Sequence, residues 1–262
     1  MSGPSFSIRK RLADCKAAGK PFVFPWVGMP GVAQAAQIAR MGFDAVALDL
    51  QHSTIDMGEA AKMVAAINMV GTPAVLRILW NDPGIVGFSF DMGAAAVIAP
   101  MTNSVAQVEA LVKAAKYPPV GQRSWGGYTM LQAAGVTATE YLKESNSHTL
   151  VFAMVETQEA LDVVDKIAAV KGLDGLFVGP SDLSIALSNG AKIDRLGAQT
   201  LDVMKKVAAS CMANGLVAGA FAGTIDGVKA YHEIGFEFIA GPTDTELSRM
   251  GAGAFLTEVG KG

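Results

Sequence analysis

Cysteine and long apolar runs are both scarce in this sequence of 262 residues. The two cysteines, Cys15 and Cys211, have no CxxC spacing, so the sequence predicts two buried or inert thiols rather than a disulfide framework or a thiolate metal site. No apolar segment approaches the roughly 18 residues that span a bilayer, and no apolar stretch follows the basic amino end. We therefore expect a cytoplasmic protein with no membrane partner.

Charge is also low, at 17% of residues against a usual value of about 25%. The formal net charge of −3 leaves no basic excess to neutralise a phosphate backbone, so we expect no nucleic-acid partner. With 51% hydrophobic residues and 13 methionines, the chain has more apolar surface than one subunit is expected to hide. The composition therefore predicts a homo-oligomer.

Short apolar runs alternate with longer amphipathic ones, which is typical of repeated βα units. Eight runs predict strands, at 22–27, 45–50, 74–79, 95–99, 150–155, 175–178, 217–221 and 238–240. Helices are predicted at 8–18, 32–41, 57–70, 105–116, 158–169, 196–214 and 225–234. The count predicts an α/β protein, a (β/α)8 barrel, forming a single domain over residues 1–262, with a doubly wound open sheet as the alternative.

One segment, 117–147, breaks this periodicity. It contains Pro118, Pro119 and four glycines, and a short helix is predicted near Glu140. We expect this segment to be either a lid or a contact between subunits.

Charged and polar residues directly follow several of the predicted strands. Asp49 and His52 follow the second, Arg77 the third, Glu156 the fifth and Asp182 the sixth. Because the active sites of such barrels lie at the carboxyl ends of the strands, these five residues predict one active site at that end of the barrel. Any one of them alone is more often a helix cap or a surface charge, and their joint occurrence favours the active site.

Glu156 and Asp182 follow adjacent strands and are close enough in a barrel to share a cation. Two carboxylates suit Mg²⁺ or Mn²⁺, which leave their remaining positions to water and substrate oxygens. The alternative is that each carboxylate caps the helix that follows it. The turn at Gly179 and Pro180 frees backbone N–H groups at a helix start, which predicts an organic acid as substrate.

The other polar candidates have roles suited to their chemistry. His52, the one histidine with acidic neighbours, is predicted to act as a base. Arg77 is predicted to meet a substrate oxygen or a carboxylate, with a purely structural ion pair as the alternative. None of the 14 lysines lies on a predicted strand, so we expect neither a Schiff-base lysine nor a pyridoxal phosphate cofactor.

Several stretches together resemble the HpcH/HpaI aldolase family of class II pyruvate aldolases. They are GFDAVALDLQHSTID, VLRILWNDP, AAKYPPVGQR and VETQEALDVVDKIAAVKGLDGLFVGPSDLS, and the likeness covers about residues 20–250. The resemblance implies a (β/α)8 barrel of the phosphoenolpyruvate/pyruvate superfamily. It also implies a homohexamer whose carboxyl-terminal helices are exchanged between subunits.

The resemblance further implies a site. A divalent ion (Mg²⁺, Mn²⁺ or Co²⁺) would be held by Glu156 and Asp182 and chelated by pyruvate. His52 would be the base, Arg77 would stabilise the enolate, and Asp91 would raise the basicity of the histidine. Asp91 precedes the fourth strand, at the wrong end of its own barrel, so we expect it to reach the histidine of an adjacent subunit.

Three positions depart from the family pattern. Gln51 stands where an acidic residue usually precedes the histidine, which puts metal preference in question. Met154 replaces a polar residue that would touch the substrate, and Ser181 replaces an alanine whose backbone binds it. The substrate-binding residues predicted are thus Asp49, Met154, Gly179, Pro180 and Ser181.

The function predicted is reversible cleavage of a 4-hydroxy-2-oxo acid to pyruvate and an aldehyde. Two alternatives keep the same metal-enolate site, namely decarboxylation of oxaloacetate and cleavage of a CoA ester. A third is a non-catalytic acid-binding barrel, which would leave His52, Glu156 and Asp182 without a role.

Overall fold

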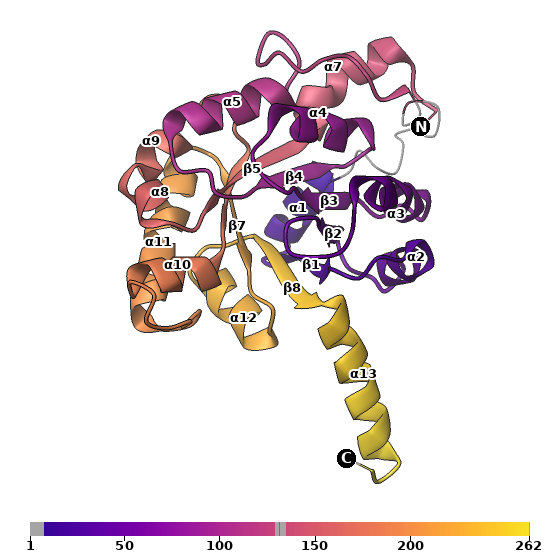
Figure 1. Cartoon of the computed structure of the whole chain (residues 1–262), viewed down its shortest axis with the longest axis vertical. Helices are drawn as coiled ribbons and strands as arrows, with labels where there is room; N and C mark the ends of the chain where they lie inside the picture. Colours follow the sequence, from indigo (N-terminus) through magenta and orange to yellow (C-terminus); the bar gives the residue numbers. More distant parts are fainter. Residues whose placement is uncertain (1–7, 129–130, 132–134, 262) are drawn as a thin grey trace.

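Eight short strands of a computed structural model, which describes residues 8–128, 131 and 135–261, close into one parallel barrel (Figure 1). Each strand pairs with the next in sequence, and the last pairs with the first. The strands are β1 (Phe22–Val27), β2 (Val46–Asp49), β3 (Ala74–Arg77), β4 (Ala96–Ala99), β5 (Leu150–Val155), β6 (Gly175–Val178), β7 (Val217–Phe221) and β8 (Phe238–Thr243). The predicted (β/α)8 barrel is confirmed, and the open sheet is wrong.

Helices surround the barrel, as Figure 1 shows. They are α1 (Ile8–Ala17), α2 (Val32–Ala39), α3 (Met57–Met69), α4 (Pro83–Asp91), α5 (Val105–Ala115), α7 (Ala138–His148), α8 (Gln158–Asp162), α9 (Val164–Ala168), α10 (Pro180–Leu187), α11 (Ala198–Ala213), α12 (Ile225–Glu233) and α13 (Asp244–Glu258). The helix predicted at 158–169 is broken at Val163, whose φ of −121° is not helical. No described helix is long and apolar enough to cross a membrane.

Helix α4 was missed from the sequence. Its residues include two glycines and several β-branched or aromatic side chains, which have low helix propensity. Its start nevertheless has a clear marker, because the Asp82 side chain accepts hydrogen bonds from the backbone N–H groups of Gly84 and Ile85 and Pro83 occupies the first turn. A local cap and tertiary packing outweigh the weak propensity of this segment.

Aromatic rings fill the interior of the barrel. Phe24, Phe152 and Phe238 are completely buried, and the Phe238 ring centroid lies 4.4 Å from that of Phe24 and 4.7 Å from that of Phe152. Small residues make room for these rings, since a Cβ at Gly175 would overlap the Phe152 ring. This packed floor closes the barrel below the site, as expected of a barrel that is a core and not a pore.

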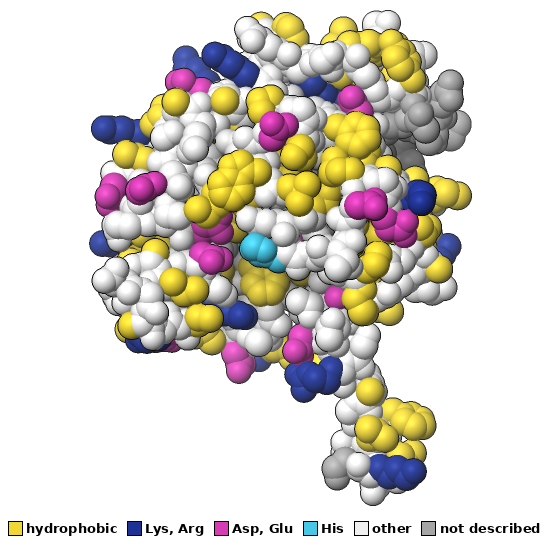
Figure 2. Space-filling view, in the orientation of Figure 1, with side chains coloured by type: hydrophobic (Ala, Val, Ile, Leu, Met, Phe, Trp, Pro, Cys, Tyr) yellow, Lys and Arg dark blue, Asp and Glu magenta, His cyan; other side chains and the backbone are white. Residues whose placement is uncertain are grey.

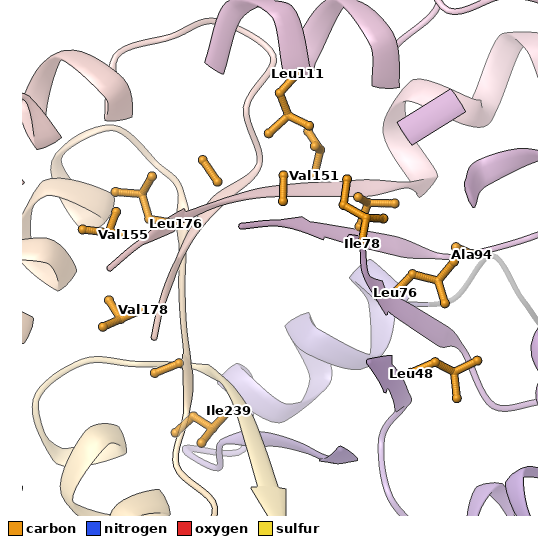
Figure 3. Close-up of a cluster of buried hydrophobic side chains, with 14 of the residues drawn as sticks. Leu48, Leu76, Ile78, Ala94, Leu111, Val151, Val155, Leu176, Val178 and Ile239 are labelled. Atoms are coloured by element: carbon orange, nitrogen blue, oxygen red, sulfur yellow. The ribbon is translucent and has the colours of Figure 1, made fainter. Parts of the chain in front are cut away.

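A second apolar layer lies between the strands and the helices. Figure 3 shows strand residues such as Leu76, Val151 and Leu176 directed outward, with Leu111 of α5 facing Val151 from the helix side. All four side chains are completely buried. Burial of such side chains stabilises the fold by about 1.5–3 kcal/mol each, so this layer holds the helices in register with the strand ends.

A buried ionic cluster lies at the amino end of the barrel. The Lys116 ammonium is 2.7 Å from the Asp174 carboxylate and donates to the Thr149 carbonyl at 2.9 Å, and Arg9 also pairs with Asp174. Burial lowers the pKa of Lys116 despite the attraction of Asp174. The cluster ties α1 to the residues that lead into β5 and β6.

The segment after α5 lies at this same end because it leads into the first residue of β5. Helix α7 confirms the helix predicted near Glu140, and it begins with a capping box formed by Thr137 and Glu140. Tyr117 and Tyr141 are buried and pack with Trp125. None of the described residues of 117–147 lines the cavity at the carboxyl end, so these residues form no lid over it.

Both cysteines are free thiols. Cys211 is 1% exposed, and burial raises its pKa to about 12, so this thiol is inert as expected. Cys15 is half-buried, and burial together with Asp44 raises its pKa as well.

Helix α13 extends away from the barrel (Figure 1), and its only buried residue is Asp244.

Candidate active site

Asp49 and Arg77 form the first part of the site, at the carboxyl ends of β2 and β3. The strand register places their Cα atoms opposite one another. The guanidinium donates from Nε to Asp49 Oδ1 at 2.8 Å and from a terminal nitrogen to Oδ2 at 2.5 Å. Arg77 also lies over the Trp26 ring, 4.9 Å from its centroid. The guanidinium is therefore held in one orientation from two sides.

Asp49 is only 4% exposed, and protein donors occupy both of its carboxylate oxygens. Besides Arg77, it accepts hydrogen bonds from the Trp26 indole N–H at 3.1 Å and from the backbone N–H groups of Gln51 and His52. Burial acts to raise the pKa of Asp49, but the bonds and attraction of Arg77 outweigh it and hold the pKa below its usual value.

This placement corrects the predicted role of Asp49. It is not among the described residues that line the cavity, and it lies behind Arg77, so its position does not support direct substrate binding. Instead it orients Arg77 and the turn that carries His52. Arg77 therefore pairs with a carboxylate, that of Asp49, and also lines the cavity.

Glu156 lies at the end of β5 and is 4% exposed. Its Oε1 atom accepts a hydrogen bond of 2.7 Å from the backbone N–H of Met101, the second residue after the end of β4. Met101 has a φ of 51°, an uncommon conformation for a residue with a side chain. This conformation directs the N–H of Met101 toward Oε1 of Glu156. The other carboxylate oxygen, Oε2, accepts no hydrogen bond from the described residues.

Gly179 provides the space beside that second oxygen. The β5–β6 register aligns Val155 with Val178, so Glu156 and Gly179 leave the barrel side by side. A Cβ at Gly179 would lie 2.8 Å from Glu156 Oε2 and 3.1 Å from the Met154 methyl carbon. Glycine is therefore required here for the carboxylate to keep its place.

Asp182 completes the carboxylate pair from the first turn of α10. Burial raises the pKa of Glu156, the Met101 N–H opposes that rise, and the negative charge of Asp182 adds to it. Two mutually repelling carboxylates, one with an unused oxygen beside a glycine, are the environment that a hard divalent cation stabilises. The described residues contain no group of three or more His, Cys, Asp or Glu with metal-ligand geometry. The residues present fit a cation held by two carboxylates, with its other positions left to water and substrate.

The helix-cap alternative for these carboxylates is wrong. Thr157, and not Glu156, caps α8, because its side chain accepts a hydrogen bond from the Ala160 N–H. Helix α10 is capped at Gly179 without any side-chain bond, and Asp182 lies inside its first turn. Neither carboxylate is therefore occupied by capping.

His52, Arg77 and Asp182 meet in one cavity of about 330 Å³. Met154, Gly179, Pro180 and Ser181 also line it, as their predicted substrate contacts require. The His52 ring forms no hydrogen bond with the described residues, and its side chain is exposed. Figure 2 shows a histidine near the centre of the visible face, at the edge of a hollow with hydrophobic atoms in its floor.

Asp91 does not join this cavity. It lies at the end of α4, where the buried Arg123 donates to its Oδ1 at 2.5 Å, and a Cβ at Gly126 would lie 2.5 Å from its Oδ2. Its place at the far end of its own barrel is as expected. Gln51, which departs from the family pattern, has a buried side-chain oxygen with no hydrogen-bond partner among the described residues.

The sequence did not indicate the apolar walls of the cavity. These are formed by Trp26, Phe177, Ile185, Ile193 and Phe221. A search for polar residues after apolar runs does not find these walls. In the sequence, an apolar residue that lines the cavity and one that fills the barrel interior belong to the same kind of apolar run. The nearest indication was the position of Phe221 as the last residue of a strand.

Comparison with known proteins agrees with this geometry. The sequence profile of the HpcH/HpaI aldolase/citrate lyase family matches residues 25–250. The chain is 34% identical over 237 residues to a hydroxypyruvate/pyruvate aldolase of Rhizorhabdus wittichii, which covers 90% of this chain and 93% of that protein. It is 28% identical to a 4-hydroxy-2-oxo-heptane-1,7-dioate aldolase of Salmonella arizonae, over 97% of this chain and 95% of that one.

The fold agrees as well. The crystal structure of an HpcH/HpaI aldolase/citrate lyase family protein from Burkholderia cenocepacia superposes with a TM-score of 0.83 at 28% identity. The superposition covers 97% of this chain and 98% of that one. The chain belongs to the HpcH/HpaI aldolase/citrate lyase family.

Proposed function

We propose that this protein is a divalent-metal-dependent pyruvate aldolase, which cleaves 4-hydroxy-2-oxo acids to pyruvate and an aldehyde and catalyses the reverse reaction. The observation that carries the proposal is the single cavity that combines His52, Arg77 and Asp182, with Glu156 and its free oxygen alongside. Cleavage of the C3–C4 bond of a 4-hydroxy-2-oxo acid uses a base, a fixed positive charge and carboxylates that can hold a metal ion. His52, Arg77 and the pair of Glu156 and Asp182 are suited to these three tasks.

The chain's own residues account for the proton and for the charge. His52 takes the proton of the 4-hydroxyl group, directly or through one water, and the C3–C4 bond breaks to release the aldehyde. The bonding electron pair moves into the enolate of pyruvate, and a proton added at C3 completes the product. Arg77, already oriented by Asp49 and Trp26, stabilises the negative charge on the enolate oxygen without having to reorient.

Glu156 and Asp182 would hold the cation, which when bound polarises the 2-oxo group as a Lewis acid. The substrate carboxylate lies within reach of the turn at Gly179, Pro180 and Ser181, which begins α10. Backbone N–H groups at a helix start favour a carboxylate. Mg²⁺, Mn²⁺ and Co²⁺ are the ions we propose, and carboxylate and water oxygens suit the first two in particular.

Chelation is expected to abolish pyruvate release, and added Mg²⁺, Mn²⁺ or Co²⁺ to restore it. The measurement is a coupled pyruvate assay after dialysis against EDTA, with mass spectrometry of the aldol product in the reverse direction. Borohydride treatment in the presence of pyruvate is the control for an imine. Full activity in EDTA, or a trapped pyruvate adduct, would contradict the proposal.

We further propose a homo-oligomer, a hexamer, in which Asp91 of one subunit approaches His52 of another. Three features support it: Asp91 lies away from its own cavity, the His52 ring has no partner within the described chain, and α13 leaves the barrel with exposed apolar side chains such as Phe255 and Leu256. A carboxylate next to His52 would hold the imidazole in its basic tautomer.

Mixing an Asp91→Ala chain with a His52→Ala chain is expected to restore activity, because some mixed interfaces then contain both intact residues. In a random mixture up to about a quarter of such sites are intact, against almost none in either variant alone. Subunit exchange is verified by native mass spectrometry. Mixed oligomers that stay as inactive as the separate variants would show that the site is not shared.

A further inference from the structure

A basic residue with no role in the reaction lies at the apolar edge of the cavity. The guanidinium carbon of Arg195 is 5.8 Å from the centroid of the Phe221 ring, and Phe221 lines the cavity together with Ile193. A Cβ at Gly223 would lie 3.5 Å from one terminal nitrogen of Arg195, so the guanidinium lies against both the ring and the turn that follows β7. Its place is therefore defined although its side chain is exposed.

The backbone that carries Arg195 is fixed on both sides. The buried Tyr231 donates a hydrogen bond of 2.9 Å from its hydroxyl to the Arg195 carbonyl, and burial raises the pKa of Tyr231 to about 12, so the hydroxyl remains a donor. At the preceding residue, the Asp194 N–H donates to Ser184 at 3.0 Å and the Asp194 carbonyl accepts from Thr200 at 2.8 Å. The 188–197 connection thus presents Arg195 from an ordered support.

The charge of Arg195 is not neutralised within the described chain. Its neighbour Lys192 pairs with Asp194 at 2.9 Å, which uses the one carboxylate in this stretch, and no ion pair forms at the Arg195 guanidinium among the described residues. The carboxylates of the site, Glu156 and Asp182, have the task of holding a cation. Arg195 therefore remains available for an anion at the apolar edge.

We propose that Arg195 is a specificity-determining residue that binds an anionic group, a carboxylate or a phosphate, at the far end of the aldehyde. This rests on the proposed aldolase function. The aldehyde carbon has to lie near His52, and its chain can extend along Phe221 and Ile193 to reach the guanidinium. A guanidinium binds either anion with two parallel hydrogen bonds, so the shared chemistry is an acidic aldehyde.

The test compares matched aldehydes with pyruvate as the common partner. One pair is 4-oxobutanoate and butanal, and the other is glyceraldehyde 3-phosphate and glyceraldehyde. Arg195→Gln is expected to lower kcat/KM for at least one of the anionic aldehydes by about tenfold and to change it for the neutral ones by less than about twofold, as loss of one solvated charge-assisted contact implies. The pair that responds identifies carboxylate or phosphate as the group recognised.

Lys192→Gln is the matched control, because it removes the same charge from the same connection at a residue that already has a partner. It is expected to change no aldehyde by more than about twofold. Higher salt should weaken the preference of the wild type and not that of Arg195→Gln. Equal losses for anionic and neutral aldehydes, or no loss with either anion, would overturn the proposal for Arg195 while leaving the aldolase function intact.

A binding measurement keeps the two proposals separate. In calorimetric titrations with Mg²⁺ present, the wild type is expected to bind pentanedioate about tenfold more tightly than pentanoate, and Arg195→Gln to bind the two alike. If no aldehyde condenses with pyruvate, the aldolase function fails, and these titrations still decide whether Arg195 binds a carboxylate. Equal affinities in the wild type would exclude that.

Discussion

Replacement of Glu156 by Gln is expected to lower kcat for pyruvate release by about 10³-fold or more, because the contribution of a bound cation to transition-state stabilisation is several kcal/mol. The exchange is isosteric. The glutamine oxygen can still accept the hydrogen bond from the Met101 N–H, and only the negative charge and the second acceptor beside Gly179 are lost. The fold should therefore survive, with a thermal midpoint close to that of the wild type.

Two measurements accompany the kinetics. Mn²⁺ binding by equilibrium dialysis should weaken together with activity, and Glu159→Gln is the control, since Glu159 is an exposed carboxylate on the next helix that does not line the cavity. A Glu156→Gln enzyme that keeps a tenth of its activity, or that binds Mn²⁺ as tightly as the wild type, would contradict the role given to this carboxylate.

Asp49→Asn is expected to lower the free energy of unfolding by about 3 kcal/mol at pH 7, which is the lower end of the range for breaking a buried ion pair. The Arg77 side chain is 11% exposed and would be left with an amide in place of its carboxylate. Asp202→Asn provides the control, because the Asp202–Lys205 pair is exposed and its loss should cost less than about 1 kcal/mol. The measurement is urea unfolding of each variant.

The difference in free energy of unfolding between the wild type and Asp49→Asn depends on pH through the pKa of Asp49. Burial raises this pKa and Arg77 lowers it by more, so the folded value lies below the unfolded value of about 3.9. The stabilisation is therefore fully present above the unfolded pKa and is lost as the pH falls through the folded one. Wild type and Asp49→Asn should differ equally at pH 7 and pH 5 and converge below about pH 4. A difference that grew on acidification would refute the ion-pair explanation.

The polar half of the site could be predicted from the sequence because a parallel barrel brings all its strand ends to one face. That geometry alone brings His52, Arg77 and Asp182 together, whatever the details of packing. The role of Asp49 could not be predicted in the same way. Only the register of β2 against β3 shows that it lies opposite Arg77, and register depends on tertiary packing.

The apolar half of the site and one helix escaped prediction for different reasons. Phe177 and Phe221 differ from ordinary core residues only in lying at the end of the barrel that opens into the cavity. The periodicity of apolar residues in the sequence does not show at which height in the barrel a residue lies. Arg195 lies in an irregular connection between two helices, where sequence gives no direction to a side chain. For α4, the sequence Asp82–Pro83 is typical of a helix start, but the low helix propensity of the residues that follow led to the helix being missed.

The cluster of Arg9, Lys116 and Asp174 lies at the opposite end of the barrel from the cavity, and none of the three lines it. The ionic cluster and the lining of the cavity can therefore be substituted separately, since no residue belongs to both and the effects of distant substitutions usually add. Directed evolution of acceptor range should accordingly begin in the 188–197 connection, where we propose that Arg195 selects the aldehyde.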